Sequence, residues 1–138
     1  MPTEKKFVLW FDEIGMEDVP LVGGKSASLG EMTRRTGVPV PYGFATTAEA
    51  YRYYLKANKL DEKMAKILKE IKDPNDTQTL QKVGAKIREI ISTAKMPDDL
   101  EKAIVDAYNS LAEKVGEKDP FVAVRSSATA EDLPDASF

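Results

Sequence analysis

Hydrophobic positions recur at helical spacing through the middle and second half of the chain. Two segments have apolar side chains three or four residues apart: Leu80, Val83, Ile87, Ile90, Ile91 and Ala94, and then Leu100, Ile104, Ala107, Tyr108, Leu111 and Val115. This period is typical of amphipathic helices. Pro97 and two aspartates indicate where the second helix begins, and Gly116 indicates where it ends. We predict that the two helices pack as an antiparallel pair joined by a short turn.

Shorter helices are predicted before this pair. Thr46 and Glu49 have the spacing of a capping box, which opens a helix with Tyr51, Tyr54 and Leu55 on its apolar face. A second short helix carries Met64, Ile67, Leu68 and Ile71 and ends at the sequence DPND, residues 73–76. A third spans Lys25 to Arg35, with Gly37 as its stop signal. The tyrosines at 51, 53 and 54 are interpreted as core and rim residues.

Three short apolar runs have the character of β-strands: Phe7–Phe11, Gly43–Thr46 and Phe121–Val124. The pattern therefore predicts a helix-rich α/β (α+β) fold with a small β-sheet. A length of 138 residues suits one domain or a piece of a larger one.

Composition and charge narrow the possible functions. The net charge of −3 argues against a nucleic-acid or membrane-surface partner, which usually requires a basic excess. The chain has no cysteine, which excludes disulfides and thiolate metal sites, and no histidine, the usual general base and phosphoryl carrier. Because the apolar run at Phe7–Phe11 is too short for a signal peptide or a membrane span, we expect a cytoplasmic location.

The stretch LVGGKSASLGEM, residues 21–32, contains half of a Walker motif. The motif G-x-x-x-x-G-K-[ST] requires its first glycine five residues before Gly24, where Val19 stands. A P-loop is therefore not expected. Two interpretations stay open. The glycine pair and the N-terminus of the following helix can cradle an anion that Lys25 contacts, or the pair is a turn before a helix with a solvated lysine.

The stretch VAVRSSATAED, residues 122–132, is the second candidate. Arg125 follows the predicted strand, and its planar guanidinium matches two phosphate oxygens at once. Ser126, Ser127 and Thr129 add hydroxyl groups with little bulk. The alternative is that Arg125 forms an ion pair with Glu131 or Asp132.

The acidic residues at the end of the chain are a weaker candidate. Glu131, Asp132 and Asp135 resemble a magnesium site, but Mg²⁺ usually takes one or two carboxylates together with substrate phosphates. We interpret them as capping or solvated residues and assign no metal ligand in this chain.

Taken together, three stretches resemble the phosphoenolpyruvate synthase (pyruvate, water dikinase) family. They are VLWFDEIGMEDVPLVGGKSASLGEM, GVPVPYGFATTAEAYRYYL and the terminal VAVRSSATAEDLPDASF, so that the resemblance runs from about Val8 to the last residue. The ending VRSSATAEDLPDASF is the most specific of them. Pyruvate, phosphate dikinase shares the glycine–lysine stretch and the arginine, and rifamycin phosphotransferase shares an ending of this kind.

The resemblance implies an ATP-grasp nucleotide-binding domain, of which residues 1–138 would be the N-terminal lobe. In the family, the lysine of the GGK stretch and the arginine of the VRS stretch contact ATP phosphates, roles that fall on Lys25 and Arg125. The family reaction converts ATP, pyruvate and water to phosphoenolpyruvate, AMP and phosphate, with Mg²⁺. A histidine on a separate domain carries the phosphoryl group to a distant pyruvate site, and the enzymes tend to form homodimers.

The chain also departs from the family pattern. It contains no histidine that could carry the phosphoryl group, so no catalytic residue is assigned. We expect a fragment that ends inside the nucleotide domain and does not turn over alone. Alternatives are the ATP-binding domain of rifamycin phosphotransferase or of pyruvate phosphate dikinase. A different class, a non-catalytic helical interaction module, would show an apolar patch on the helices and nothing convergent around Lys25 and Arg125.

Overall fold

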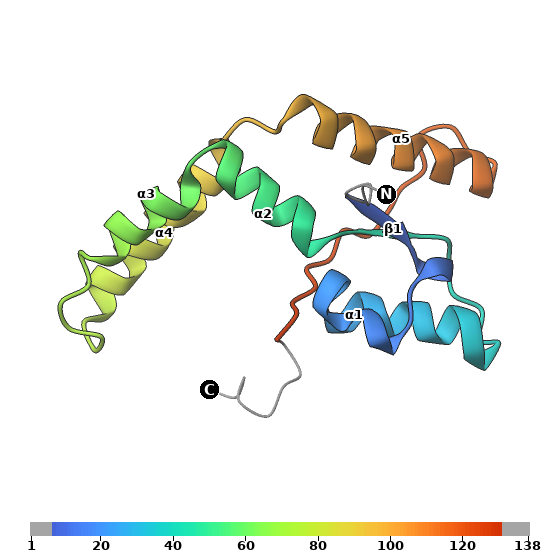
Figure 1. Ribbon diagram of the computed structural model, residues 1–138, viewed down its shortest axis with the longest axis horizontal. Coiled ribbons are helices and arrows are strands. Elements are labelled where there is room, and N and C mark those ends of the chain that lie inside the picture. The colour runs from blue at the N-terminus through green and yellow to red at the C-terminus, as the bar shows by residue number, and fades with distance from the viewer. Residues whose placement is uncertain (1–6, 131–138) are drawn as a thin grey trace, which may run out of the picture. The chain divides into compact units, whose positions relative to one another are not determined.

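A computed structural model describes residues 7–130 of the chain (Figure 1). The chain divides into two compact units. The first joins the polypeptide up to Tyr51 to the polypeptide from Asp98 onward, and the second consists of Arg52–Pro97. The second unit is therefore an insertion within the first. The secondary structure is that of a helix-rich α+β domain with a small sheet, as predicted.

The sheet of the first unit is a pair of antiparallel strands, β1 (Val8–Trp10) and β2 (Phe44–Thr46), in which Leu9 faces Ala45. Both strands lie within the predicted apolar runs. The first strand is shorter than its run because a 3₁₀ turn, η1 (Phe11–Glu13), begins at Phe11. The Phe11 N–H donates to the Gly43 carbonyl oxygen at 3.0 Å, which holds this turn on the sheet.

Helix α1 (Val19–Glu31) follows a second 3₁₀ turn, η2 (Met16–Asp18), and continues into a π-helical turn, η3 (Met32–Thr36). The predicted stop at Gly37 is confirmed, since this glycine has the left-handed φ of 71°. A first helical turn begins at Val19, with Pro20 in it, and a kink at Gly23 separates this turn from the helix that follows. The helix predicted to start at Lys25 is the part of α1 after this kink.

The core of the first unit is built where α1 crosses the sheet. Ile14, Val22, Ala27 and Ala45 form its buried cluster. Ile14 is fully buried, and the backbone of Gly30 lies directly against it: a Cβ at Gly30 would be 2.4 Å from the Ile14 carbonyl oxygen. Gly30 therefore sets how closely the helix approaches this part of the chain.

Helix α5 (Asp98–Val115) packs against β1 and buries Leu100, Ala107 and Leu111. Its predicted limits are confirmed: it begins directly after Pro97 and is followed by Gly116 in the left-handed conformation, with φ of 72°. Helix α4 (Thr77–Thr93) packs against α3 (Leu60–Leu68) within the second unit, and the predicted pairing of α4 with α5 stays a prediction.

The second unit consists of the end of α2 (Ala48–Ala57) together with α3 and α4 (Figure 1). The Tyr54 hydroxyl donates to the Ile91 and Ala94 carbonyl oxygens, which confirms its interpretation as a packing residue. The cap of α2 is one residue later than predicted. Thr47, not Thr46, accepts the Ala50 N–H at its Oγ1, because Thr46 is used in the β2 ladder.

The polypeptide after α5 contradicts the predicted strand at Phe121–Val124. These residues form no strand, and Phe121 and Val124 are 105% and 90% exposed. A strand requires a neighbouring backbone to complete its ladder. In the described part of the chain, the Tyr108 hydroxyl holds the start of this segment by donating to the Pro120 carbonyl oxygen at 2.7 Å.

Within residues 7–130, no helix combines the length and apolar character that crossing a membrane would require.

Two of the helical glycines, Gly30 and Gly84, give a matched test of this packing. Alanine in an open helix position usually stabilises by about 0.5–1 kcal/mol over glycine. At Gly84 a Cβ meets only the flexible end of Arg88 at 3.2 Å, so Gly84→Ala should raise the free energy of unfolding by that amount. Gly30→Ala should lower it by about 1–3 kcal/mol through overpacking. Denaturant titration followed by circular dichroism measures both, and a stabilised Gly30→Ala variant would contradict the packing described for Ile14.

The cap of α4 should titrate. The Asp76 carboxylate accepts hydrogen bonds from the Thr79 hydroxyl and from the Thr79 N–H, which hold the pKa of Asp76 below its ordinary value. Because the folded pKa is the lower one, this stabilisation is present above the unfolded pKa of about 4 and is lost as pH falls through the folded value. Helicity measured from pH 6 to 2 should therefore fall further in the wild type than in Asp76→Asn, whose cap carries no titrating group. An equal loss of helicity with falling pH in the wild type and in Asp76→Asn would contradict a titrating cap.

Candidate nucleotide-binding site

The two candidate stretches, about 100 residues apart in the chain, lie against each other in the folded protein. The Gly24 N–H donates to the Ala128 carbonyl oxygen at 3.1 Å. The Ser26 N–H donates to the Ser127 Oγ at 3.3 Å. We call this contact, between residues 23–26 and residues 127–128, the docking contact. Figure 1 shows the segment after α5 running back to the first half of α1.

Gly23 makes the docking contact possible. Its φ of 83° and ψ of 168° interrupt α1 with a kink, in a region of backbone space that favours glycine. A Cβ at this position would lie 2.3 Å from the Ser127 Oγ and 2.8 Å from the Ala128 nitrogen. Residues 127 and 128 can therefore reach the helix only because residue 23 has no side chain.

This use of the glycine pair differs from the predicted anion cradle. The close approach that Gly23 permits is made by the protein's own backbone, and the N–H groups of Gly24 and Ser26 are bonded to protein acceptors. The other alternative, a glycine turn before a helix, is closer to the structure, because Gly23 has non-helical φ and ψ and the second helical part of α1 follows it directly. The physical reason is that the helix following the kink has N–H groups that need acceptors, and the distant segment supplies them.

Lys25 and Arg125 stand on the two sides of the docking contact. Lys25 is an exposed residue between Gly24 and Ser26, and Arg125 is exposed two residues before Ser127. Standard backbone dimensions and the hydrogen bond at Ser26 put their Cα atoms at most about 15 Å apart. Arg125 does not follow a strand, as the sequence had predicted, but lies in the segment that the docking contact holds.

The other candidates divide between the described and undescribed parts of the chain. Ser126 and Thr129 are exposed residues of the same segment as Arg125. The acidic residues Glu131, Asp132 and Asp135 lie outside the described residues, and so does the proposed ion pair of Arg125. Among residues 7–130 there is no group of three or more Asp, Glu, His or Cys side chains placed to hold a metal ion.

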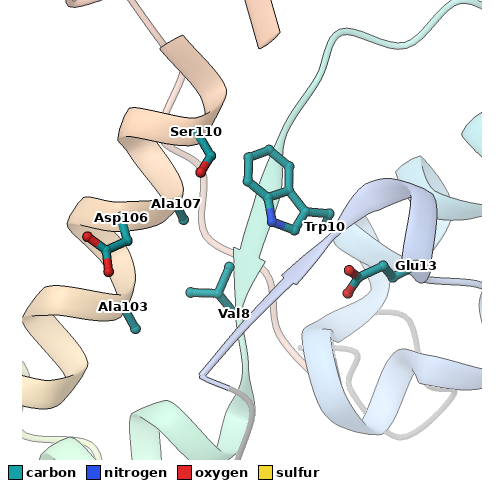
Figure 2. Close-up of a pocket in the computed structure, with 7 residues that line it drawn as sticks. All are labelled: Val8, Trp10, Glu13, Ala103, Asp106, Ala107 and Ser110. Atoms are coloured by element: carbon teal, nitrogen blue, oxygen red, sulfur yellow. The ribbon is translucent and has the colours of Figure 1, made fainter. Parts of the chain in front are cut away.

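A separate open pocket of about 350 Å³ lies between β1 and α5 (Figure 2). Its lining includes Trp10, Ser110 and two acidic residues, Glu13 and Asp106, but neither Lys25 nor Arg125. Figure 2 shows the Asp106 carboxylate turned away from Val8 and Trp10, and it accepts a hydrogen bond from the Lys102 ammonium at 2.7 Å. The carboxylates of Glu13 and Asp106 in its lining disfavour an anionic ligand in this pocket.

The aromatic ring of Trp10 also faces a cation. The Lys114 ammonium lies 4.9 Å from the centre of the Trp10 ring and 5.6 Å from that of Tyr42. Such cation–π contacts contribute about 0.5–1 kcal/mol at exposed sites. This contact joins the end of α5 to the sheet, and it helps to fix where the segment after α5 begins.

Residues 19–138 match the family described as pyruvate phosphate dikinase, AMP/ATP-binding domain. Because the match covers most of the chain and includes both candidate stretches, the chain belongs to this family. The class of protein is therefore a nucleotide-binding domain of the dikinase type, which confirms the resemblance found in the sequence.

Relatives with curated names point in the same direction. The chain is 53% identical to phosphoenolpyruvate synthase of Aquifex aeolicus over 97% of its length, and 47% identical to that of Synechocystis over 98%. It is 50% identical to phosphoenolpyruvate synthase of Neisseria meningitidis over 96%. The chain spans 16 to 17% of the length of these three relatives, and between 11 and 20% in others.

Gly23→Ala should break the docking contact. The added methyl group meets Ser127 and Ala128, so the amides of Gly24 and Ser26 should lose protection against hydrogen exchange. Gly37→Ala is the matched control, because Gly37 has a similar positive φ of 71° but a Cβ there meets nothing within 4 Å. The two backbones differ in ψ, which is 168° at Gly23 and 3° at Gly37, so Gly23→Ala adds strain in a region nearly restricted to glycine as well as the clash, while Gly37→Ala adds only left-handed strain. Only Gly23→Ala should release the segment. Equal protection of Gly24 and Ser26 in the two variants would contradict the contact.

Proposed function

We propose that this chain is the N-terminal lobe of an ATP-grasp nucleotide-binding domain in a phosphoenolpyruvate synthase, and that Lys25 and Arg125 bind the phosphates of ATP. The observation that carries the proposal is the docking contact, which brings the segment of the lysine to that of the arginine. Membership of an AMP/ATP-binding domain family supports the choice of ligand.

The two residues suit the chemistry of phosphoryl transfer. That reaction depends mainly on holding the phosphates in place and neutralising their charge. An exposed lysine ammonium acts as a mobile point charge, whereas arginine offers two parallel donors to two oxygens. The overall reaction that we propose for the whole enzyme converts ATP, pyruvate and water to phosphoenolpyruvate, AMP and phosphate. The phosphoryl carrier would be a histidine outside this chain, which has none.

Magnesium would accompany the nucleotide. Mg²⁺ usually binds one or two carboxylates together with substrate phosphates. Lys25 and Arg125 would then share the remaining phosphate charge with it.

The exposed segment at Phe121–Val124 supports a larger domain. Phe121 and Val124 are large apolar side chains in full contact with solvent, next to Arg125. The relatives are five to nine times longer than the stretch they share with this chain. We propose that further polypeptide of the same nucleotide domain covers this run, with pyruvate bound at a distant site of a homodimeric, cytoplasmic enzyme.

The alternatives are less well supported. The relatives named above carry the name phosphoenolpyruvate synthase, which favours that enzyme over rifamycin phosphotransferase and pyruvate phosphate dikinase. A non-catalytic helical module gives no reason for segments about 100 residues apart to meet beside two cations.

The test uses the full-length enzyme in which the chain occurs. Lys25→Ala and Arg125→Ala should each weaken binding of Mg·ATP about tenfold to a hundredfold, since a hydrogen bond to a charged group contributes about 1.5–3 kcal/mol. ATP-dependent phosphorylation should fall sharply while the fold stays intact by circular dichroism. Lys118→Ala, an exposed lysine of the same unit, is the control and should bind normally. Wild-type affinity and rate in both site variants would rule out the assignment.

The chain alone should bind Mg·ATP weakly, because the proposed cleft would be incomplete without the rest of the domain. A titration followed by amide chemical shifts measures this, and the largest shifts are expected around Lys25 and Arg125. Binding in the micromolar range by the chain alone would contradict a site that needs further polypeptide.

A further inference from the structure

The hydroxyl of Ser127 links the two halves of the proposed phosphate site. Its oxygen accepts the N–H of Ser26 at 3.3 Å, and Ser26 itself is buried, with 8% of its surface exposed. The neighbouring Ala128 carbonyl oxygen accepts the Gly24 N–H. One side chain and one peptide group of the segment thus bind the two residues that flank Lys25.

The segment that carries Arg125 is held at its two ends. Near its start, the Pro120 carbonyl oxygen accepts the Tyr108 hydroxyl, and at its end Ser127 and Ala128 make the docking contact. The side chains of Phe121 and Val124 between these points are exposed and make little packing contribution. The position of Arg125 therefore depends on the anchors, and the nearer anchor, two residues away, is Ser127.

We propose that Ser127 is a positioning residue for nucleotide binding, which acts through Arg125. Its hydroxyl fixes the arginine segment to the residues around Lys25, so that the two cations hold one spacing before the polyphosphate arrives. This inference rests on the proposed function of Lys25 and Arg125. From the sequence, the Ser127 hydroxyl is expected to donate a hydrogen bond to a ligand. In the structure its oxygen instead accepts a hydrogen bond from the Ser26 backbone N–H.

A role through Arg125 has a signature that direct contact with ATP lacks. If Ser127 only places the guanidinium, its removal matters while Arg125 is present and matters little once Arg125 is gone. If the hydroxyl contacted the nucleotide directly, the losses of binding free energy in the two single variants would add in the double variant. A double-mutant cycle separates these cases, because coupled residues are non-additive.

The experiment measures Mg·ATP affinity in the full-length enzyme for Ser127→Ala, Arg125→Ala and the double variant. Ser127→Ala should weaken binding about three- to tenfold, the effect of about one hydrogen bond. In the Arg125→Ala background the same change should alter affinity less than about twofold. Ser127→Thr keeps the hydroxyl oxygen and should retain most of the affinity, while Ser110→Ala, on α5, is the matched control.

Hydrogen exchange of the Ser26 amide without nucleotide tests the contact separately from binding. Ser127→Ala should exchange faster at Ser26 than wild type or Ser127→Thr. Wild-type affinity in Ser127→Ala, or additive losses in the double variant, would overturn the positioning role while leaving Arg125 as a ligand of ATP. Unchanged affinity in Arg125→Ala itself would remove Arg125 from the proposed site and overturn this role with it, even with faster exchange at Ser26, and unchanged affinity in Lys25→Ala as well would overturn the proposed function.

Discussion

The approach of residues 127 and 128 to Gly23 is the constraint on which the proposed site depends. The hydrogen-bonded pair Ser26 and Ser127 is separated by 101 residues of chain. Closing a loop of that length costs about 4 kcal/mol in chain entropy by its length term alone. The two hydrogen bonds of the docking contact return only about 0.5–1.5 kcal/mol each. The contact must therefore rely on other packing that has already brought the segment back.

That packing is supplied by α5 on β1. Leu100, Ala107 and Leu111 are buried along the helix, and Lys114 lies over the Trp10 ring near its end. Fully burying a leucine side chain contributes about 1.5–3 kcal/mol, so the two buried leucines contribute an amount comparable with the cost of closure. Because α5 returns the chain to the first unit, the segments of Lys25 and Arg125 belong to the same compact unit, although the second unit is inserted between them in the sequence. The proposed site thus depends on the apolar packing of α5 on β1 and on the absence of a side chain at Gly23.

Much of the fold could be predicted from local sequence. Pro97 and Gly116 mark the ends of α5 correctly, and Gly37 ends the first helical segment, because these residues act through their own backbone geometry. The prediction that failed has a physical cause, since the apolar run at Phe121–Val124 cannot form a strand without a neighbouring backbone. The amphipathic face of α4 likewise indicates that the helix packs, but it does not specify α3 as a partner.

By itself the sequence determined the family, and short motifs such as LVGGKS and VAVRSS supplied the two cations that are proposed to bind phosphate. It could not reveal that Gly23 receives Ser127 and Ala128, because nothing in either motif specifies a contact across 101 residues. Only the tertiary structure decided that the glycine accommodates protein backbone. A residue without a Cβ allows another group to approach its backbone closely, and the tertiary structure determines which group does so.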